Sequence, residues 1–312
     1  MRGLSNKFMS SLKEGFLFPI LERVKKDDTL MLAIRDGYIN LYYRGGNLLK
    51  ITESNSTYEV FFDQEYDKSE DKSVINSLHL PKSITTIKDA EKCISLIPLL
   101  KEMMDFYLIK IRKSEREFQQ LVARENNKST ISGQTEYFIT DIEYADSNIG
   151  AKFDMTAIIW PASGRTNGTT CRPAFIEMKY GDKQLGGNSG LVKHIEDIHT
   201  FLSTPSNYST ILKEMTMQFN QLDELGLLDY NHCTNETKVV LDVSDKPEFI
   251  FLLANHNPRS SKLKSILMSQ DFIKYTKSKY FNLRFFVSSD AGYGMHRANM
   301  IPYEEYLKGL DL

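Results

Sequence analysis

Two neighbouring apolar runs carry charged side chains: KFDMTAIIW (residues 152–160) and FIEMKYGD (residues 175–182). Both runs have the β-branched and aromatic composition of short strands. Side chains alternate along a strand, so Glu177 and Lys179 share one face while Met178 points the other way. If the two strands pair as neighbours, Asp154 reaches that same face. The two runs therefore predict two carboxylates and one ammonium at one end of a sheet.

The segments around these runs predict the rest of the domain. Residues 136–146, 248–255 and 283–290 have strand composition, and residues 248–255 form a continuous apolar run typical of a buried strand. Apolar residues recur at helical spacing over 191–202 and 210–226, and residues 260–279 read as a basic helix. The order helix, three strands, helices, strand, helix, strand favours an α/β fold with a mixed sheet flanked by helices.

The N-terminal part of the chain has a different character. Residues 1–26 predict an amphipathic helix, two apolar runs around Gly45 and Gly46 predict a hairpin, and residues 64–74 predict a loop. Residues 86–128 show helical spacing. We therefore expect a smaller N-terminal α+β unit over residues 1–85 and a second domain over 86–312, entered through a helical connector at 86–111.

Composition restricts the classes of protein to which the chain can belong. It has 312 residues and a formal net charge of -2, which excludes a uniformly basic nucleic-acid coat but allows a basic groove. No apolar run approaches the roughly 18 residues of a membrane span, and the N-terminus lacks a signal-peptide cleavage site. Its three cysteines are far apart and have no zinc or disulfide spacing. These features predict a cytoplasmic protein with no membrane partner.

The carboxylate pair predicts metal chemistry. Charged side chains are rarely buried without partners, and Mg²⁺ or Mn²⁺ would join Asp154 and Glu177 through their oxygen atoms. Such an ion would polarise a phosphoryl oxygen, and Lys179 would orient water or stabilise charge in the transition state. An E-x-K triplet alone is also typical of a solvated strand face with an ion pair. The aspartate on the preceding strand favours the metal site.

The order of these elements resembles the core of the PD-(D/E)XK nuclease superfamily, which has the restriction-endonuclease-like fold. The resemblance covers residues 112–290 and depends on Asp154, Glu177 and Lys179, although Phe153 stands where the motif has proline. It implies a metal-dependent nuclease. SEREFQQLV (residues 114–122) is similar to the first core helix of archaeal Holliday-junction resolvases, which implies Glu115 as a further metal-linked residue. Glu117 and Glu125 are alternatives, and each of the three is equally compatible with a solvated helix carboxylate.

Several further residues are candidates for the site. Many superfamily members carry a glutamine on a helix after E-x-K, which points to Gln218 as a partner of the lysine or the phosphate. Gln218 is the one polar residue of a stripe formed by Ile211, Met215, Leu222 and Leu225, so a buried amide bonded to backbone is an equal alternative. Positive charge predicts contacts with nucleic-acid phosphates at Lys183, Lys193, Lys262, Lys264 and Lys274. For Lys183, Lys193 and His194 a solvated surface residue is the better interpretation, and for the basic helix a solvated face is an equal one. Tyr275, Tyr280 and Phe281 would then stack on single-stranded ends.

The sequence thus predicts a Mg²⁺- or Mn²⁺-dependent nuclease that hydrolyses phosphodiester bonds, in DNA rather than RNA. Double-strand cutting needs two active sites, so a homodimer is compatible with this function. Two alternatives remain: a non-catalytic nucleic-acid-binding module on a nuclease-like core, and an interaction protein that works through its N-terminal unit.

Overall fold

The computed structural model describes residues 1–55, 57–69, 72–128, 135–165, 170–230, 238–256, 261–288, 295, 297 and 300–310. The chain divides into two compact units. The first comprises Met1–Gln120 and Gln221–Leu227, and the second comprises Leu121–Asn220 and Leu228–Leu312. The division falls inside helix α5 (Ser114–Asn127) and not at residue 85, because α4 (Ile87–Lys110) packs on strands of the first unit.

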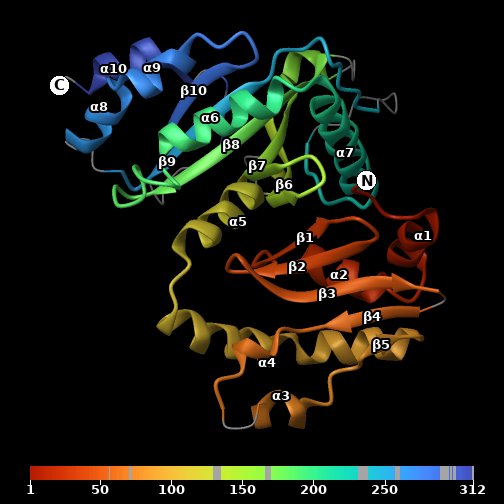
Figure 1. Cartoon of the computed structure of the whole chain (residues 1–312). Helices are drawn as coiled ribbons and strands as arrows, with labels where there is room; N and C mark the ends of the chain where they lie inside the picture. The colour runs from red at the N-terminus through yellow and green to blue at the C-terminus, as the bar shows by residue number, and fades with distance from the viewer. Residues whose placement is uncertain are drawn as a thin grey trace. The chain divides into compact units, whose positions relative to one another are not determined.

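The first unit contains a five-stranded antiparallel sheet with the order β1-β2-β3-β4-β5 (Figure 1). Its strands are β1 (Leu30–Ile34), β2 (Tyr38–Tyr43), β3 (Gly46–Ser54), β4 (Thr57–Phe61) and β5 (Ser83–Ile84). Its helices, besides α4, are α1 (Asn6–Glu14), α2 (Phe18–Lys26), the 3-10 helix η1 (Gln64–Tyr66) and α3 (Ser73–Leu78). The predicted hairpin is confirmed as β2 and β3, while the run before it holds two strands, β1 and β2.

Two other predictions for this unit need correction. The single helix expected over residues 1–26 is two helices, because α1 ends at Glu14 and the backbone of Gly15 is extended. The loop expected over residues 64–74 contains η1 and the start of α3. The apolar sides of α1, α2 and α4 are buried, as expected for amphipathic helices that pack in a core: Phe8, Leu12, Ile20, Val24, Ile97, Leu100 and Met104.

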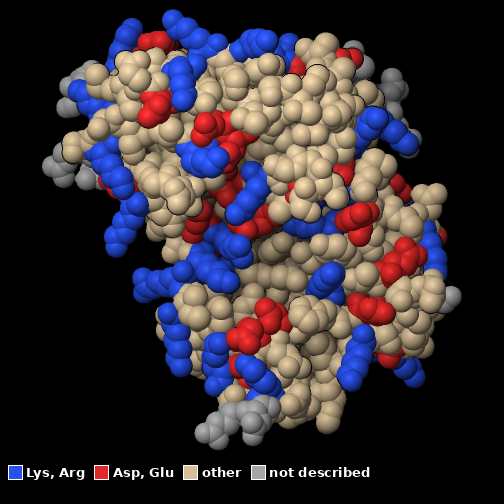
Figure 2. All heavy atoms as spheres, in the orientation of Figure 1, with Lys and Arg blue, Asp and Glu red and all other residues tan. Residues whose placement is uncertain are grey.

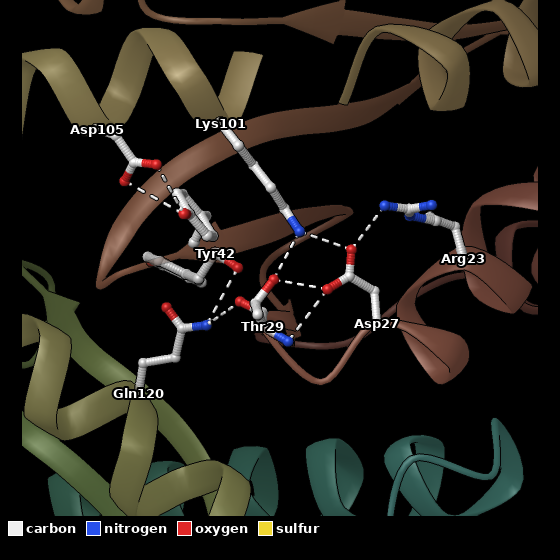
Figure 3. Close-up of polar contacts among 8 residues, drawn as sticks. Arg23, Asp27, Thr29, Tyr42, Lys101, Asp105 and Gln120 are labelled. Atoms are coloured by element: carbon white, nitrogen blue, oxygen red, sulfur yellow. Dashed lines mark hydrogen bonds and ion pairs between the residues drawn. The ribbon is translucent and has the colours of Figure 1, made fainter. Parts of the chain in front are cut away.

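A polar network joins α4 to the segment between α2 and β1. Lys101 donates hydrogen bonds to Asp27 Oδ2 and to Thr29 Oγ1, both at 2.6 Å, and Arg23 donates to the same carboxylate at 2.8 Å (Figure 3). The side chains of Asp27 and Lys101 are only 11% and 15% exposed. Gln120, at the end of the first unit, donates to the backbone oxygens of Thr29 and Tyr42.

The second unit contains a six-stranded mixed sheet with the order β11-β10-β9-β8-β7-β6 (Figure 1). Its strands are β6 (Tyr137–Asp146), β7 (Ala151–Ile159), β8 (Arg172–Tyr180), β9 (Glu248–Ala254), β10 (Asn282–Ser288) and β11 (Ile301–Pro302). Strands β6, β7 and β8 are antiparallel neighbours, and β8, β9 and β10 run parallel. The prediction of a mixed sheet with helices on its faces is confirmed.

The helices of this unit are α6 (Leu191–Leu202), α7 (Pro205–Glu224), α8 (Ser261–Leu267), α9 (Gln270–Thr276), α10 (Tyr303–Gly309) and the 3-10 helix η4 (Ala162–Gly164). Helix α7 begins five residues earlier than predicted, since proline is well suited to the first position of a helix. The single helix expected over 260–279 is two, because Ser269 caps α9 by accepting from Phe272 N. Neither β11 nor α10 was predicted. No helix in the described ranges has both the length and the apolar character of a membrane span.

Aromatic packing identifies the helices on one face of this sheet. Phe175 on β8 contacts Phe201 of α6, with 6.4 Å between ring centroids, and Phe285 on β10 stacks on Tyr306 of α10 at 4.6 Å. Phe251 on β9, opposite Glu177 in the β8–β9 register, packs on Phe272 of α9. Because residues two apart on a strand share a face, Glu177 and Lys179 continue the face that begins with Phe175.

Candidate functional site

The side chain of Asp154 on β7 lies against β8, the strand that carries Glu177. The described β7–β8 pairing runs from Ile159 with Arg172 to Met155 with Ile176 and ends one residue before Asp154. Here the side chain of Asp154 bonds to the neighbouring backbone: its Oδ2 accepts from Met178 N at 2.8 Å. The two strands are therefore neighbours, as predicted, and the Asp154 carboxylate is held directly against the E-x-K segment.

Glu177 and Lys179 form a buried ion pair on this face. Lys179 Nζ lies 3.0 Å from Glu177 Oε1, and each residue is only 3% exposed. Burial and the negative charge of Asp154 raise the pKa of Glu177 well above its ordinary value, while Lys179 opposes that shift. One ammonium thus faces two carboxylates in a poorly hydrated place. Carboxylate oxygens are the ligands that hard divalent cations prefer, so the donor chemistry of the pair fits Mg²⁺ or Mn²⁺.

His194 joins this pair, although sequence reasoning took it for a surface residue. It lies in the first turn of α6, and its Nε2 is 3.0 Å from Glu177 Oε1 and 3.1 Å from the backbone oxygen of Ser189. Burial, followed by the positive charge of Lys179, lowers the pKa of His194 to about 4, so the ring is neutral at pH 7. The only signal in the sequence was its place beside Ile195 on the apolar stripe of the helix.

The loop before α6 determines where His194 lies. Leu191 N donates to the backbone oxygen of Leu185, and Gly190 N donates to that of Gly187, so the chain folds tightly back on itself. A Cβ atom on Gly190 would lie 2.6 Å from Gly186 Cα and 2.7 Å from the backbone oxygen of Leu185. Only glycine fits at residue 190 without a shift of the loop.

The proposed third carboxylate is not tested by this geometry. Within the described residues, no group of three or more His, Cys, Asp or Glu side chains is arranged to hold a metal ion. Glu115 is half-buried in the first turn of α5 and belongs to the first unit, whereas Asp154 and Glu177 belong to the second. Of its two alternatives, Glu117 accepts from Arg44 at 2.7 Å, and Glu125 accepts from Arg124 at 2.9 Å.

Gln218 is fully buried, and the predicted apolar stripe on α7 is confirmed. The hydrogen-bond partner of Gln218, however, differs from both predicted partners. Gln218 Nε2 donates to Asp141 Oδ2 on β6 at 3.0 Å, which is neither a backbone group nor Lys179. One turn earlier on α7, the buried Glu214 accepts from Tyr144 OH at 2.6 Å. Gln218 is thus not the single polar residue on this face, and its described bond ties α7 to β6.

The predicted phosphate-binding lysines lie on the surface of the second unit. Lys183, Lys193, Lys262 and Lys274 are exposed, and Lys264 is half-buried. Lys193 pairs with Asp197 on α6, and Lys274 pairs with Asp271 on α9. On the face drawn in Figure 2, Lys and Arg are interspersed with Asp and Glu. Any nucleic-acid contact would therefore involve a local group of lysines.

The aromatic residues expected to stack on nucleic-acid bases pack against other rings of the second unit. Phe281 is only 1% exposed and packs on Phe249, with ring centroids 5.5 Å apart, so the stacking prediction is wrong for this residue. Tyr275 and Tyr280 each lie 5.0 Å from the ring of His199 on α6. These rings hold α6 and the α9 segment together.

Comparisons of the chain with protein-family models, with curated proteins and with solved structures found no match.

Proposed function

We propose that this chain is a metal-dependent nuclease that hydrolyses phosphodiester bonds in nucleic acid, with DNA as its substrate. The observation that carries the proposal is the bond from Met178 N that holds the Asp154 carboxylate against the E-x-K segment, where Lys179 is bonded to Glu177. Two carboxylates and an ammonium held close together suit a site that binds a divalent ion beside a phosphate.

The chain topology around these residues supports a restriction-endonuclease-like core. Helix α5 precedes an antiparallel meander of β6, β7 and β8, two helices follow, and β9 then pairs parallel to β8. This is the order expected from the PD-(D/E)XK resemblance, with the aspartate on the second strand and E-x-K on the third.

Asp154 and Glu177 would hold Mg²⁺ or Mn²⁺. When bound, the ion would polarise a phosphoryl oxygen and lower the pKa of a water molecule. Lys179 contributes a fixed positive charge, which favours the ionised form of Glu177 and would stabilise the charge that develops on the phosphate. The bond from Met178 N keeps the Asp154 carboxylate in place before any ion arrives.

The polymeric substrate would be held by charge. Lys262 Nζ donates to the backbone oxygens of Asp182 and Lys183, which follow the E-x-K strand. Lysines placed there would neutralise phosphates near the site and release counterions. The choice of DNA, a homodimer for double-strand cutting and a cytoplasmic location belong to the proposal and follow from the resemblance and the composition.

Cleavage of supercoiled plasmid DNA tests this function. We expect nicked and linear products with Mg²⁺, none with excess EDTA, and none from Lys179→Met, which keeps the length of the side chain and removes its charge. Lys308→Met on the exposed side of α10 is the matched control and should cut normally. Cleavage by Lys179→Met at the wild-type rate, or cleavage that survives EDTA, would contradict the proposal.

A non-catalytic nucleic-acid-binding module is the second candidate. The observation that favours it is the Glu177–Lys179 ion pair, which is complete without an ion. A gel-shift assay with the same plasmid fragments separates the two functions. Binding that persists in EDTA, without cleavage in Mg²⁺ or Mn²⁺, would favour the module over the nuclease.

A further inference from the structure

We infer that His194 is a positioning residue for the metal-binding carboxylate of Glu177, an inference that rests on the proposed function. Two side-chain nitrogen atoms lie against a single oxygen of that carboxylate. Lys179 Nζ and His194 Nε2 each lie 3.0 Å from Glu177 Oε1. The lysine comes from β8 itself, whereas the histidine comes from α6, so two separate elements fix the same atom.

The second contact of His194 identifies the hydrogen that it donates. The backbone oxygen of Ser189, 3.1 Å from Nε2, can only accept a hydrogen bond. Nε2 therefore carries a hydrogen that bonds to Ser189, and the same nitrogen lies 3.0 Å from Glu177 Oε1. The hydrogen bond that a ring nitrogen makes determines the tautomer of a histidine.

This arrangement divides the two oxygens of Glu177 between two tasks. A carboxylate oxygen has about two lone-pair sites, and on the Oε1 side Lys179 Nζ donates a hydrogen bond while His194 Nε2 lies in contact. Rotation of the carboxylate would disturb both contacts, so they favour an orientation in which Oε2 is the oxygen that binds an ion shared with Asp154. Groups that orient a metal-binding carboxylate in this way typically change metal affinity by about 10- to 100-fold.

The role is specific to position, and the same helix supplies a control. His199 also lies on α6, but its ring packs between Tyr275 and Tyr280. His194→Gln retains an N–H donor near the position of Nε2, and His194→Ala removes it. His194→Met removes the donor while keeping apolar bulk, which provides a second test if the alanine variant folds poorly. Circular dichroism melts of the whole chain establish that each variant is folded.

The experiment measures the Kd for Mn²⁺ by electron paramagnetic resonance, together with plasmid cleavage at saturating Mn²⁺. We expect His194→Ala and His194→Met to raise the Kd about 10- to 100-fold, and to recover most of the cleavage rate once Mn²⁺ is saturating. His194→Gln should bind within a few-fold of wild type, and His199→Gln should not differ from it.

Two results would overturn the inference while leaving the nuclease proposal intact. One is a Kd for His194→Ala within twofold of wild type. The other is a loss of affinity in His194→Gln as large as in His194→Ala, since the amide donor would then have no value. If the wild-type chain neither binds Mn²⁺ nor cleaves, the proposed function fails, and the inference that rests on it fails too.

Discussion

The carboxylate of Asp154 accepts a hydrogen bond at 2.8 Å from the backbone nitrogen of Met178, the residue between Glu177 and Lys179. A side chain on β7 thus takes a bond that would otherwise join backbone to backbone between paired strands. This bond joins two strands directly, so the position of the aspartate against the E-x-K segment does not depend on the surrounding loops. Asp154 thus has two roles that can be tested separately: its hydrogen bond positions the side chain, and its negative charge would bind the ion.

Asp154→Asn should therefore abolish cleavage without unfolding the protein. The amide oxygen of asparagine can still accept from Met178 N, but it brings no negative charge to the ion. We expect plasmid cleavage to fall by at least about 100-fold, in line with the loss of a group that stabilises the transition state, with a melting temperature close to wild type. Asp271→Asn on the surface of α9 is the control and should cleave normally. Full activity of the Asp154→Asn enzyme would remove the aspartate from the site.

Gly190→Ala should disturb the site from a distance. Its Cβ would lie 2.6 Å from Gly186 Cα, so the loop and the first turn of α6, including His194, must shift. We expect lower stability in thermal melts and weaker Mn²⁺ binding. Gly186→Ala is the matched control, because a Cβ there meets Lys262 Cε at an ordinary 3.6 Å. Equal melting temperatures and Mn²⁺ affinities for the two variants would show that the loop tolerates the extra atom.

Gln218→Leu should destabilise the fold because it leaves the buried Asp141 carboxylate without the amide donor. The loss of one partner of a buried hydrogen bond costs about 1–3 kcal/mol. Urea unfolding should show a free energy of unfolding reduced by that amount, while cleavage by the folded enzyme stays within a few-fold of wild type. Gln270→Leu, at the exposed start of α9, should change neither quantity. Selective loss of cleavage at unchanged stability would instead support the role first expected for Gln218.

The Asp27–Lys101 pair predicts a pH dependence of stability. Burial raises the pKa of Asp27, but hydrogen bonds from Lys101 and Thr29 outweigh it and lower the pKa to about 2. In the unfolded chain the pKa is near about 3.9, so the folded state binds fewer protons between these values. The stabilisation, about 2 kcal/mol at most, is present above pH ~4 and is lost as the pH falls toward ~2.

Comparison with Asp27→Asn isolates this contribution. The difference in melting temperature between wild type and variant should be largest at pH 5 to 7 and should narrow as the pH falls to about 2. A difference that stays constant over this range would mean that the charge of Asp27 does not contribute to stability.

Periodicity and composition were sufficient for those parts of the fold that depend on local sequence. Strands β7, β8 and β9 and helix α6 lie where their apolar patterns predict, and alternation alone placed Glu177 and Lys179 on one face. The boundary between the two units could not be predicted from local sequence. The boundary depends on which core α4 joins, and α4 joins the first because its apolar residues pack on β3 and β5.

The residues of the candidate site also differ in whether the sequence could predict them. Asp154, Glu177 and Lys179 could be found because each is a charge inside an apolar strand. His194 could not be found, since its role depends on a tight loop of three glycines that turns α6 back onto β8, and no local pattern encodes that approach. Gln218 was singled out correctly as a buried amide, but its partner lies 77 residues away on β6.

The discontinuous first unit limits genetic dissection of this chain. Its short second segment, Gln221–Leu227, follows the first three strands of the second unit's sheet in the chain, and Gln221 exchanges two hydrogen bonds with the backbone of Leu4. A truncation that removes residues 1–75, 1–85 or 1–120 removes Leu4 and leaves the side-chain amide of Gln221 without these two hydrogen bonds. Loss of function on such a truncation would report a damaged fold, so separate roles for the two units are better assigned by point substitutions in the intact polypeptide.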